Sequence, residues 1–336
     1  MNNEFKNLVV IGASAGGIKA VAKSIQGIPA SVNAAFVVVI HVSVHSNPEN
    51  IISLLQRKTF LTCKVAEMHD TIQRGHLYLA SPDMHLLVHD GKLFLEAGTF
   101  ENKFRPSVDV LFRSAAVYFK NRTIGIILTG LLNDGTSGMW AVKQCGGICI
   151  VQEPMDAEFA DMPKNVLAKI EADYICKLDE IANLTTKLVN NPLPERVLVP
   201  RALEVEVEIT RNRDTRINSM DKLATHSDFS CPDCGGRLWT ISEGKNTRYR
   251  CHTGHVYTED LLAELQDLNI KESIIIAIRM MEENSNLLVQ MKNKSQLSSE
   301  RKSYYEKRIQ NINHHIDLMK KLMVLLHESP SHDEFG

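Results

Sequence analysis

The chain has 336 residues, of which 44% are hydrophobic and 23% charged, and its formal net charge is -2. This length allows one full-sized hydrophobic core and at least one smaller unit, because single cores rarely grow beyond about 250–300 residues. The near-neutral charge provides no overall positive field, so we expect neither nucleic acid nor an anionic membrane surface as a partner. No apolar run approaches the roughly 18 residues that span a bilayer, and the start shows no cleavable signal pattern. We therefore expect a cytoplasmic protein without direct membrane insertion.

The first part of the chain, residues 1–187, alternates short β-branched runs with segments of helical period. Four runs lack a polar face, as is typical of strands covered on both sides of a parallel sheet: residues 8–11, 36–40, 124–128 and 148–151. Helices are predicted over residues 18–25, 107–120 and 138–145. Asp90-Gly91 joins two further apolar runs and predicts a hairpin appended to the sheet. The pattern indicates an α/β domain with a doubly wound, mostly parallel sheet.

The composition changes after residue 187. Residues 188–228 carry many prolines and charges, and we predict a linker with at most one extended strand, over residues 205–209. A cysteine-rich unit follows over residues 229–258. Apolar residues at helical spacing then predict an antiparallel helical hairpin over residues 259–330 that turns near residues 293–299.

The stretch VVIGASAGG, residues 9–17, leads from an apolar run into Ser14. Its G-x-S-x-G pattern is typical of a strand-to-helix turn that exposes a serine nucleophile, although the pattern alone is weak. A dinucleotide site is disfavoured because Ser14 replaces the middle glycine of the fingerprint, and His41 stands where an acidic residue is expected. A third interpretation, in which Ser14 only caps the following helix, stays open.

Two further residues follow inferred strands. His41 directly follows the run 36–40, and Asp134 lies a few residues after the run 124–128. Taken singly, His41 could be a hydrogen-bonded surface residue and Asp134 could cap the next helix. Because the carboxyl ends of parallel strands share one edge, however, Ser14, His41 and Asp134 are expected together there, as a nucleophile, its base and an orienting acid. The order Ser, His, Asp differs from that of α/β-hydrolases.

Five ordered motifs make residues 5–185 resemble the catalytic domain of the CheB-type protein-glutamate methylesterases of bacterial chemotaxis: VVIGASAGG, VVVIHVS, FRPSVDVLFRSAA, GIILTGLLNDGTSGM and DMPKNVL. The resemblance implies hydrolysis of glutamate methyl esters on the helical cytoplasmic part of chemoreceptors or a similar signalling protein, and deamidation of some glutamines. It assigns the nucleophile, base and acid to Ser14, His41 and Asp134, and the oxyanion site to backbone near Leu131. It implies no catalytic cofactor.

The sequence also departs from this family. We expect no phospho-accepting receiver domain ahead of the esterase, because the sequence begins at the first esterase strand. Ala15 stands where threonine is frequent, and Leu131-Leu132 replace a common Met-Gly. An alternative function is a non-hydrolytic signalling scaffold with a degenerate esterase fold, which the intact Ser, His and Asp disfavour.

The cysteine-rich unit has the spacing of a metal site. Cys231-x2-Cys234 faces Cys251 and His255, a set that suits a structural zinc ion in a zinc-ribbon-like module. His255 is preferred over His252, which directly abuts Cys251. The alternative is a metal-free unit packed by aromatic residues, but about 30 residues form too small a core to fold alone. Its four basic residues outnumber two acidic ones, too small a surplus for nucleic-acid binding.

Overall fold

The computed structural model describes residues 5–294 and 297–328. The chain divides after Glu259 into two compact units. The first unit holds the predicted esterase domain together with the cysteine-rich module, and the second holds the predicted helical hairpin.

A seven-stranded parallel sheet forms the centre of the first unit, in the order β3-β4-β2-β1-β7-β8-β9. Its strands are β1 (Asn7–Ala13), β2 (Ala34–Ile40), β3 (Thr62–Val65), β4 (His76–Leu79), β7 (Thr123–Ile127), β8 (Ile148–Gln152) and β9 (Tyr174–Cys176). The four predicted apolar strands are all present, which confirms the doubly wound α/β fold. Strands β3, β4 and β9 were not predicted, because each has only three or four residues.

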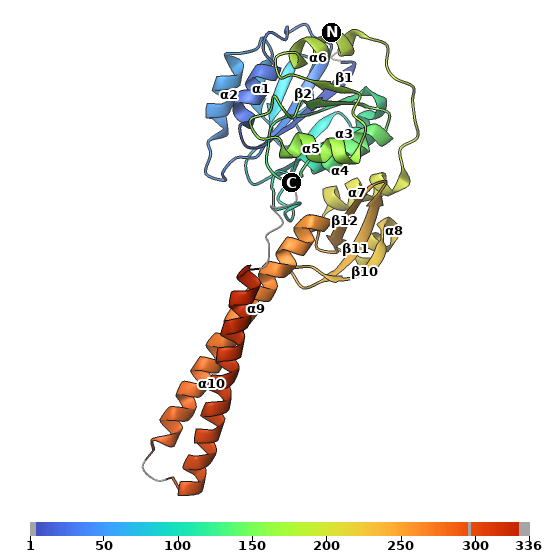
Figure 1. Cartoon of the computed structure of the whole chain (residues 1–336). Coiled ribbons are helices and arrows are strands. Elements are labelled where there is room, and N and C mark those ends of the chain that lie inside the picture. Colours follow the sequence, from blue (N-terminus) through green and yellow to red (C-terminus); the bar gives the residue numbers. More distant parts are fainter. Residues whose placement is uncertain (1–4, 295–296, 329–336) are drawn as a thin grey trace. The chain divides into compact units, whose positions relative to one another are not determined.

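Helices cover both faces of this sheet (Figure 1). One face carries α1 (Gly17–Ser24), α2 (Pro48–Gln56) and α6 (Ile181–Asn190). The other carries α3 (Val108–Phe119), α4 (Thr136–Gln144) and α5 (Asp161–Lys169), and a 3-10 turn, Lys120–Arg122, follows α3. Alternate residues of β1 enter the two cores: Leu8 and Val10 face α3, and Val9 and Ile11 face α1. Burial on both faces explains why the strand has no polar side.

The predicted hairpin exists, but it does not extend the main sheet. Strands β5 (His85–His89) and β6 (Lys92–Glu96) form a separate two-stranded sheet. Asp90 and Gly91 have φ values of 46° and 70°, the left-handed conformation of a tight hairpin turn. The hairpin packs against α3, where the backbone N–H of Val88 donates to Ser114 Oγ at 3.0 Å. Its apolar face is therefore covered by that helix and not by a sheet neighbour.

The extended strand predicted over residues 205–209 is wrong. This segment belongs to α7 (Arg201–Asn212), which is followed by α8 (Ile217–Leu223). Alternating valines and glutamates suggest a strand, but Leu203, Glu206 and Val207 are all buried, at helical spacing. The alternation misleads because Glu206 is buried among arginines instead of facing solvent.

The cysteine-rich module is an antiparallel sheet of β10 (Thr225–Ser230), β11 (Arg237–Glu243), β12 (Asn246–Cys251) and β13 (Val256–Thr258), which we call the ribbon. Trp239 is 1% exposed and packs with Ile209 of α7 and Met220 of α8. Its indole N–H donates to Asp221 at 2.9 Å. The ribbon thus shares its small core with the segment that precedes it.

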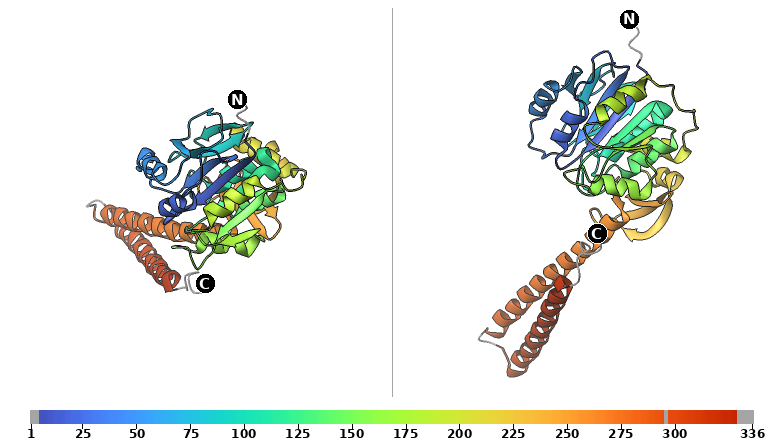
Figure 2. Two further views of the ribbon diagram at one scale, coloured as in Figure 1. Left: turned by 90° about the horizontal axis from the view of Figure 1, so that it is seen from above. Right: turned by 45° about the horizontal axis from the view of Figure 1, so that its top comes forward.

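The second unit contains α9 (Glu259–Lys292) and α10 (Ser299–Glu328), which run side by side in both views of Figure 2. Their pairing is antiparallel, because Lys292 lies 3.5 Å from Glu306 while Lys320 lies 2.8 Å from Glu282. Ser285 also donates to Asn313 at 2.9 Å. The last two residues of the hairpin predicted over 259–330 lie outside the described residues. Within the described ranges, no helix combines the length and apolarity that a membrane span requires.

Candidate active site

The three predicted catalytic residues follow three neighbouring strands at one edge of the sheet. Ala13 of β1 pairs with Ile40 of β2, so Ser14 and His41 are the next residues on adjacent strands. The N–H of His41 donates to Ala13 O at 3.0 Å, and the N–H of Ser14 donates to Thr129 O, just after β7, at 3.0 Å. Asp134 lies in the loop that continues from β7 to α4. The parallel register therefore delivers all three to the same edge.

The imidazole of His41 is held by Asp134 and by an aromatic ring. His41 Nε2 lies 2.9 Å from Asp134 Oδ2, and the two side chains are 6% and 0% exposed. Phe104 stacks on the imidazole, with ring centroids 3.6 Å apart and planes 8° from parallel. The other ring nitrogen, Nδ1, is buried and has no hydrogen-bond partner among the described residues. A nitrogen in this state is available to accept a proton.

Ser14 does not serve as a helix cap. The N-cap of α1 is Gly16, with φ 73°, and no side chain caps the helix. The Ser14 hydroxyl makes no hydrogen bond within the described part of the chain, either to His41 or to backbone. The turn therefore leaves an uncommitted hydroxyl next to the strand end that carries His41.

The Asp134 carboxylate is held mainly by the start of α3. It does not cap α4, whose N-cap is Gly135 with no side-chain cap bond, although the N–H of Gly135 also donates to it at 3.1 Å. Its carboxylate accepts hydrogen bonds from Ser107 Oγ at 2.9 Å and from the N–H groups of Val108 and Asp109 at 2.6 and 3.2 Å. Burial by itself raises the pKa of Asp134, but the bond to His41 and those from Val108 and Ser107 outweigh it, so the pKa is lowered. The carboxylate stays charged and can stabilise an imidazolium.

A second buried carboxyl, Asp109, supports the loop around Asp134. Its Oδ1 accepts from the N–H groups of Gly135 and Gly138 at 3.0 and 2.6 Å, and its Oδ2 accepts from Asn102 Nδ2 at 3.1 Å. Burial and then the charge of Asp134 raise the pKa of Asp109 well above its usual value. Sequence reasoning missed Asp109 and Phe104, although both lie in the motif FRPSVDVLFRSAA.

Gly130 provides close packing beside the serine. A Cβ at this position would lie 2.1 Å from Met162 Sδ and 2.7 Å from Ser14 Cβ. Both distances are far below van der Waals contact. Only glycine lets the loop after β7 pass this close to Ser14.

In the ribbon, the four predicted metal ligands lie together. The ligand atoms of Cys231, Cys234, Cys251 and His255 are all within 4.8 Å of one another, and His252 is not in the group. Cys231 Sγ and His255 Nδ1 are 3.6 Å apart, and Cys234 and Cys251 Sγ are 3.8 Å apart. A tetrahedral zinc ion with Zn–S bonds of about 2.3 Å separates its ligands by roughly 3.8 Å. The donor set and its spacing therefore fit zinc.

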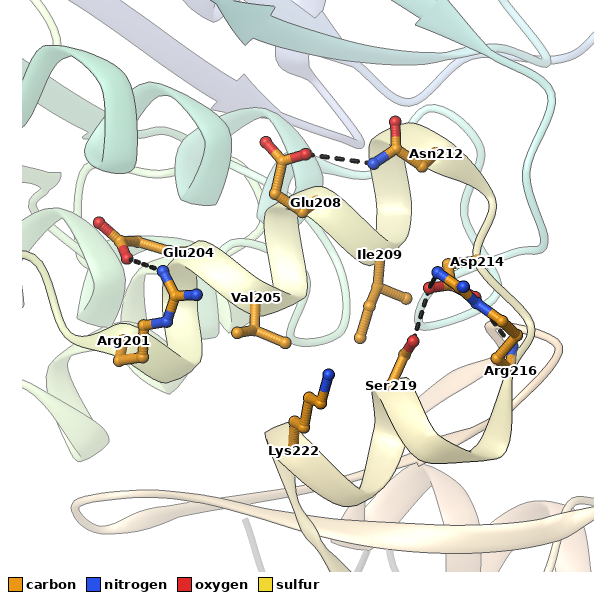
Figure 3. Close-up of a pocket in the computed structure, with 10 residues that line it drawn as sticks. All are labelled: Arg201, Glu204, Val205, Glu208, Ile209, Asn212, Asp214, Arg216, Ser219 and Lys222. Carbon is orange, nitrogen blue, oxygen red and sulfur yellow. Dashed lines mark hydrogen bonds and ion pairs between the residues drawn. The ribbon is translucent and has the colours of Figure 1, made fainter.

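A cavity of about 270 Å³ lies between α7 and α8 (Figure 3). Its lining is charged, but most of the charges pair with one another, as Arg201 does with Glu204 and Arg216 with Asp214. None of the three strand-end residues lines it. The cavity is therefore separate from the candidate active site.

Comparison with known proteins finds relatives of this chain. A family model described as CheB methylesterase matches residues 9–185. A putative protein-glutamate methylesterase/protein-glutamine glutaminase of Leptospira interrogans (strain Fiocruz L1-130) is 36% identical over 189 residues, 56% of this chain and 97% of that protein. The protein-glutamate methylesterase/protein-glutamine glutaminase of Thermotoga maritima is 34% identical over 186 residues, 54% of this chain and 54% of that protein.

A solved structure is also similar. The crystal structure of the Thermotoga maritima CheB methylesterase catalytic domain matches with a TM-score of 0.52 and 33% identity, over 54% of this chain and 98% of that domain. The sheet order, the five motifs and a family match over more than half of the residues lead to one conclusion: the chain belongs to the CheB methylesterase family.

Proposed function

We propose that this protein is a serine hydrolase that removes methyl esters from glutamate side chains of chemoreceptor-like helical proteins, and that it also deamidates glutamine side chains. We further place its action in the cytoplasm, where clustered thiols stay reduced. One observation carries the proposal. Asp134 engages one nitrogen of His41 and leaves the other unpaired, at the sheet edge where Ser14 has a free hydroxyl. The names of the relatives from Leptospira and Thermotoga support the reaction class.

The proposed mechanism is acyl transfer. Ser14 Oγ attacks the ester carbonyl while His41 Nδ1 accepts the hydroxyl proton, and Asp134 stabilises the resulting imidazolium. The oxyanion is held by backbone N–H groups in the loop around Leu131, whose own amide donates to no group in the described ranges. The imidazolium then protonates the departing methanol. Water attacks the acyl-serine with His41 as base, which releases the glutamate carboxylate and restores Ser14.

General base catalysis of this kind contributes about 10²–10⁴-fold to the rate. Deamidation follows the same steps, with ammonia leaving in place of methanol. The scaffold alternative has no support among the comparisons, and the paired His41 and Asp134 disfavour it.

The test is incubation of methylated receptor helices with the full-length protein, followed by methanol measurement and mass spectrometry of the peptides. We expect loss of methyl groups from glutamates, and labelling of Ser14 by a fluorophosphonate probe. Unmethylated helices are the substrate control. Labelling of Ser14 without methanol release would contradict the proposed substrate. Absence of both labelling and methanol release would contradict the assignment as a serine hydrolase.

Gly130→Ala is expected to lower kcat for a simple ester by about 10- to 100-fold, because the added methyl displaces Ser14 or Met162. Steady-state kinetics on a chromogenic acetate ester measure this effect. Gly98→Ala is the matched control, because its methyl would meet only His85 Cδ2, at 3.6 Å, and kcat should not change. A folded Gly130→Ala protein with the kcat of the wild type would show that the close approach does not position the nucleophile.

We also propose that Cys231, Cys234, Cys251 and His255 hold a structural zinc ion. The ion would cross-link the β10–β11 turn and the β12–β13 turn, which lie at the same end of the ribbon, and contribute to folding, without a role in the chemical step. Elemental analysis should find about one zinc per chain. Cys231→Ser should lose the metal and lower the melting temperature, whereas Cys63→Ser, in β3, should keep the metal. Full-length protein that is folded and metal-free as purified from zinc-containing medium would contradict the assignment.

A further inference from the structure

The last ribbon strand, β13, contacts two loops that lie next to the candidate catalytic residues. Val256 bridges to Glu101, and its carbonyl accepts from the N–H of Asn102 at 2.9 Å. Two residues later, Thr258 Oγ1 accepts from Asn133 Nδ2 at 2.8 Å. The contacts join segments more than 100 residues apart in the sequence.

The first contact concerns the ring that stacks on His41. Glu101 and Phe104 exchange backbone hydrogen bonds of 2.8 and 3.3 Å across a tight turn. Asn102 and Lys103 at its centre have φ values of 51° and 69°, a conformation that side chains rarely adopt unless neighbouring contacts fix it. The bond from Asn102 to Val256 fixes this turn from the ribbon side. Esterase residues hold the turn as well, through Asp109 and Arg113, so β13 is one of the supports of Phe104 over His41.

The second contact concerns the acid. Asn133 directly precedes Asp134, and its side chain is anchored on Thr258. Leu132, on its other side, has a φ of 63°, so the loop is held in an uncommon conformation. The anchor restrains the peptide that leads into Asp134.

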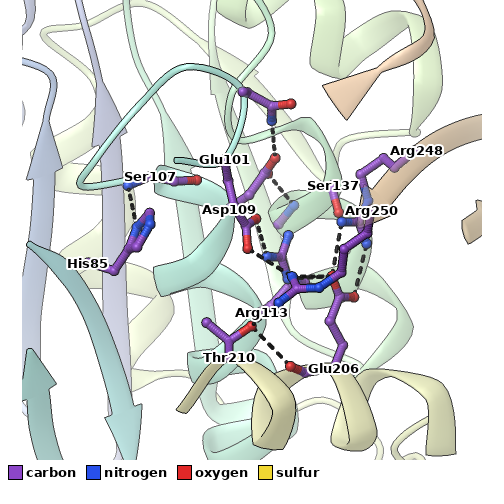
Figure 4. Close-up of polar contacts among 12 residues, drawn as sticks. His85, Glu101, Ser107, Asp109, Arg113, Ser137, Glu206, Thr210, Arg248 and Arg250 are labelled. Carbon is purple, nitrogen blue, oxygen red and sulfur yellow. Dashed lines mark hydrogen bonds and ion pairs between the residues drawn. The ribbon is translucent and has the colours of Figure 1, made fainter. Parts of the chain in front are cut away.

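The ribbon is fixed on the esterase by buried charges (Figure 4). Arg250 of β12 donates to Glu101 at 3.2 Å, so the same turn is held through both its backbone and its side chain. Arg248 donates two bonds of 3.0 Å to Glu206 of α7, and Glu206 lies 3.6 Å from Arg113 of α3. All of these side chains are at most 4% exposed.

The predicted metal site lies at the start of the same strand. His255 immediately precedes Val256, and the N–H of Cys251 donates to His255 O at 3.0 Å. A metal ion bound by Cys251 and His255 would fix the chain one residue before it reaches the Glu101 turn and three residues before Thr258. Metal binding and the geometry of both catalytic loops therefore share one short strand.

We propose that β13 is a positioning element of the esterase, with Val256 and Thr258 as positioning residues, and that metal at the ribbon site is required for full catalytic activity. The inference rests on the proposed function and on the proposed metal site. The ribbon acts through Phe104 and Asn133, and it does not contact the reacting atoms.

The first experiment breaks one contact and leaves the metal ligands intact. Thr258→Val should lower kcat by about 3- to 10-fold with KM unchanged, because the hydrogen bond that anchors the Asn133 side chain is lost. Asn133→Ala should have a similar effect, and the double variant should be no slower than either single variant. Thr247→Val, on β12, is the matched control because its hydroxyl makes no hydrogen bond within the described ranges. Wild-type kcat in Thr258→Val, or fully additive effects, would overturn the proposal.

The second experiment removes the metal from the full chain with a chelator and measures hydrogen exchange. Residues 99–104 and 130–136 should exchange faster and kcat should fall, while the central strand β1 stays protected. Zinc should restore both measurements. Unchanged hydrogen exchange and unchanged kcat in the metal-free protein would overturn the inference. Loss of β1 protection would mean that metal removal unfolds the whole domain, and together with a wild-type kcat in Thr258→Val it would also overturn the inference. An inactive wild-type protein that still shows metal-dependent exchange would instead contradict the proposed function.

Discussion

Replacement of Ser14 by alanine is expected to lower kcat for ester hydrolysis by about 10⁵- to 10⁶-fold, because the covalent route is lost. The fold should be unaffected, since the hydroxyl makes no hydrogen bond within the described residues and Gly16 provides the N-cap of α1. Fluorophosphonate labelling should disappear with the activity. Circular dichroism and the melting temperature should match those of the wild type.

The sharper form of this experiment uses a second substitution. Ser14→Ala combined with His41→Ala should be no slower than Ser14→Ala alone, because the two side chains act as one unit. Ser43→Ala, an exposed serine just beyond β2, is the matched control and should retain labelling and kcat. Residual hydrolysis at the wild-type rate in Ser14→Ala would remove the nucleophile assignment, and additive losses in the double variant would separate His41 from Ser14.

Arg248→Met is expected to lower the free energy of unfolding by about 3–5 kcal/mol, the largest effect on stability that we expect. The Arg248 side chain is 0% exposed and pairs with both Glu206 and Glu243. Three arginines and three glutamates form this cluster, and loss of one arginine leaves a buried carboxylate without compensation. Chemical denaturation followed by circular dichroism measures the change. Arg237→Met, on the exposed side of the ribbon, should change stability by less than about 0.5 kcal/mol.

The pH dependence distinguishes charge from packing in this cluster. Burial raises the pKa of Glu206, but the charges of Arg113 and Arg248 lower it by more than burial raises it. The pKa of Glu206 in the folded protein therefore lies below its value in the unfolded chain. A carboxyl with a lowered pKa stabilises the folded state at pH values above its unfolded pKa of about 4.3. This stabilisation is lost as the pH falls toward the pKa in the folded protein. The difference between wild type and Arg248→Met should therefore be largest near neutral pH and shrink in acid. A difference independent of pH would assign the effect to packing.

The elements that the sequence alone predicts are those whose signal is local. The runs 8–11, 36–40, 124–128 and 148–151 lack a polar face, and the structure buries them between two layers of helices. The pattern can be recognised in the sequence because burial on both faces favours an apolar residue at every position of such a strand. The strand-end placement of Ser14, His41 and Asp134 follows from the same logic, since parallel strands share one carboxyl edge.

Features that depend on residues far away in the sequence could not be predicted from the sequence. The segment 205–209 alternates like a strand, yet it is helical, and Glu206 is buried in a pair with Arg248, 42 residues further along the chain. The hairpin at Asp90-Gly91 packs one face against α3 and not against the main sheet, which the sequence does not show. In both cases, the sequence shows the side chains but not the surface that will cover them.

The sequence by itself determined the α/β class, the residues at the sheet edge and the three cysteines and one histidine that cluster in the ribbon, because periodicity and spacing are properties of neighbouring residues. Only the tertiary structure decided which nitrogen of His41 meets Asp134, that Phe104 stacks on His41, and that β13 contacts the turn before Phe104 and the loop before Asp134. The physical reason is that a buried charge, a stacked ring or a strained turn is stable only with partners that the folded chain brings from far away.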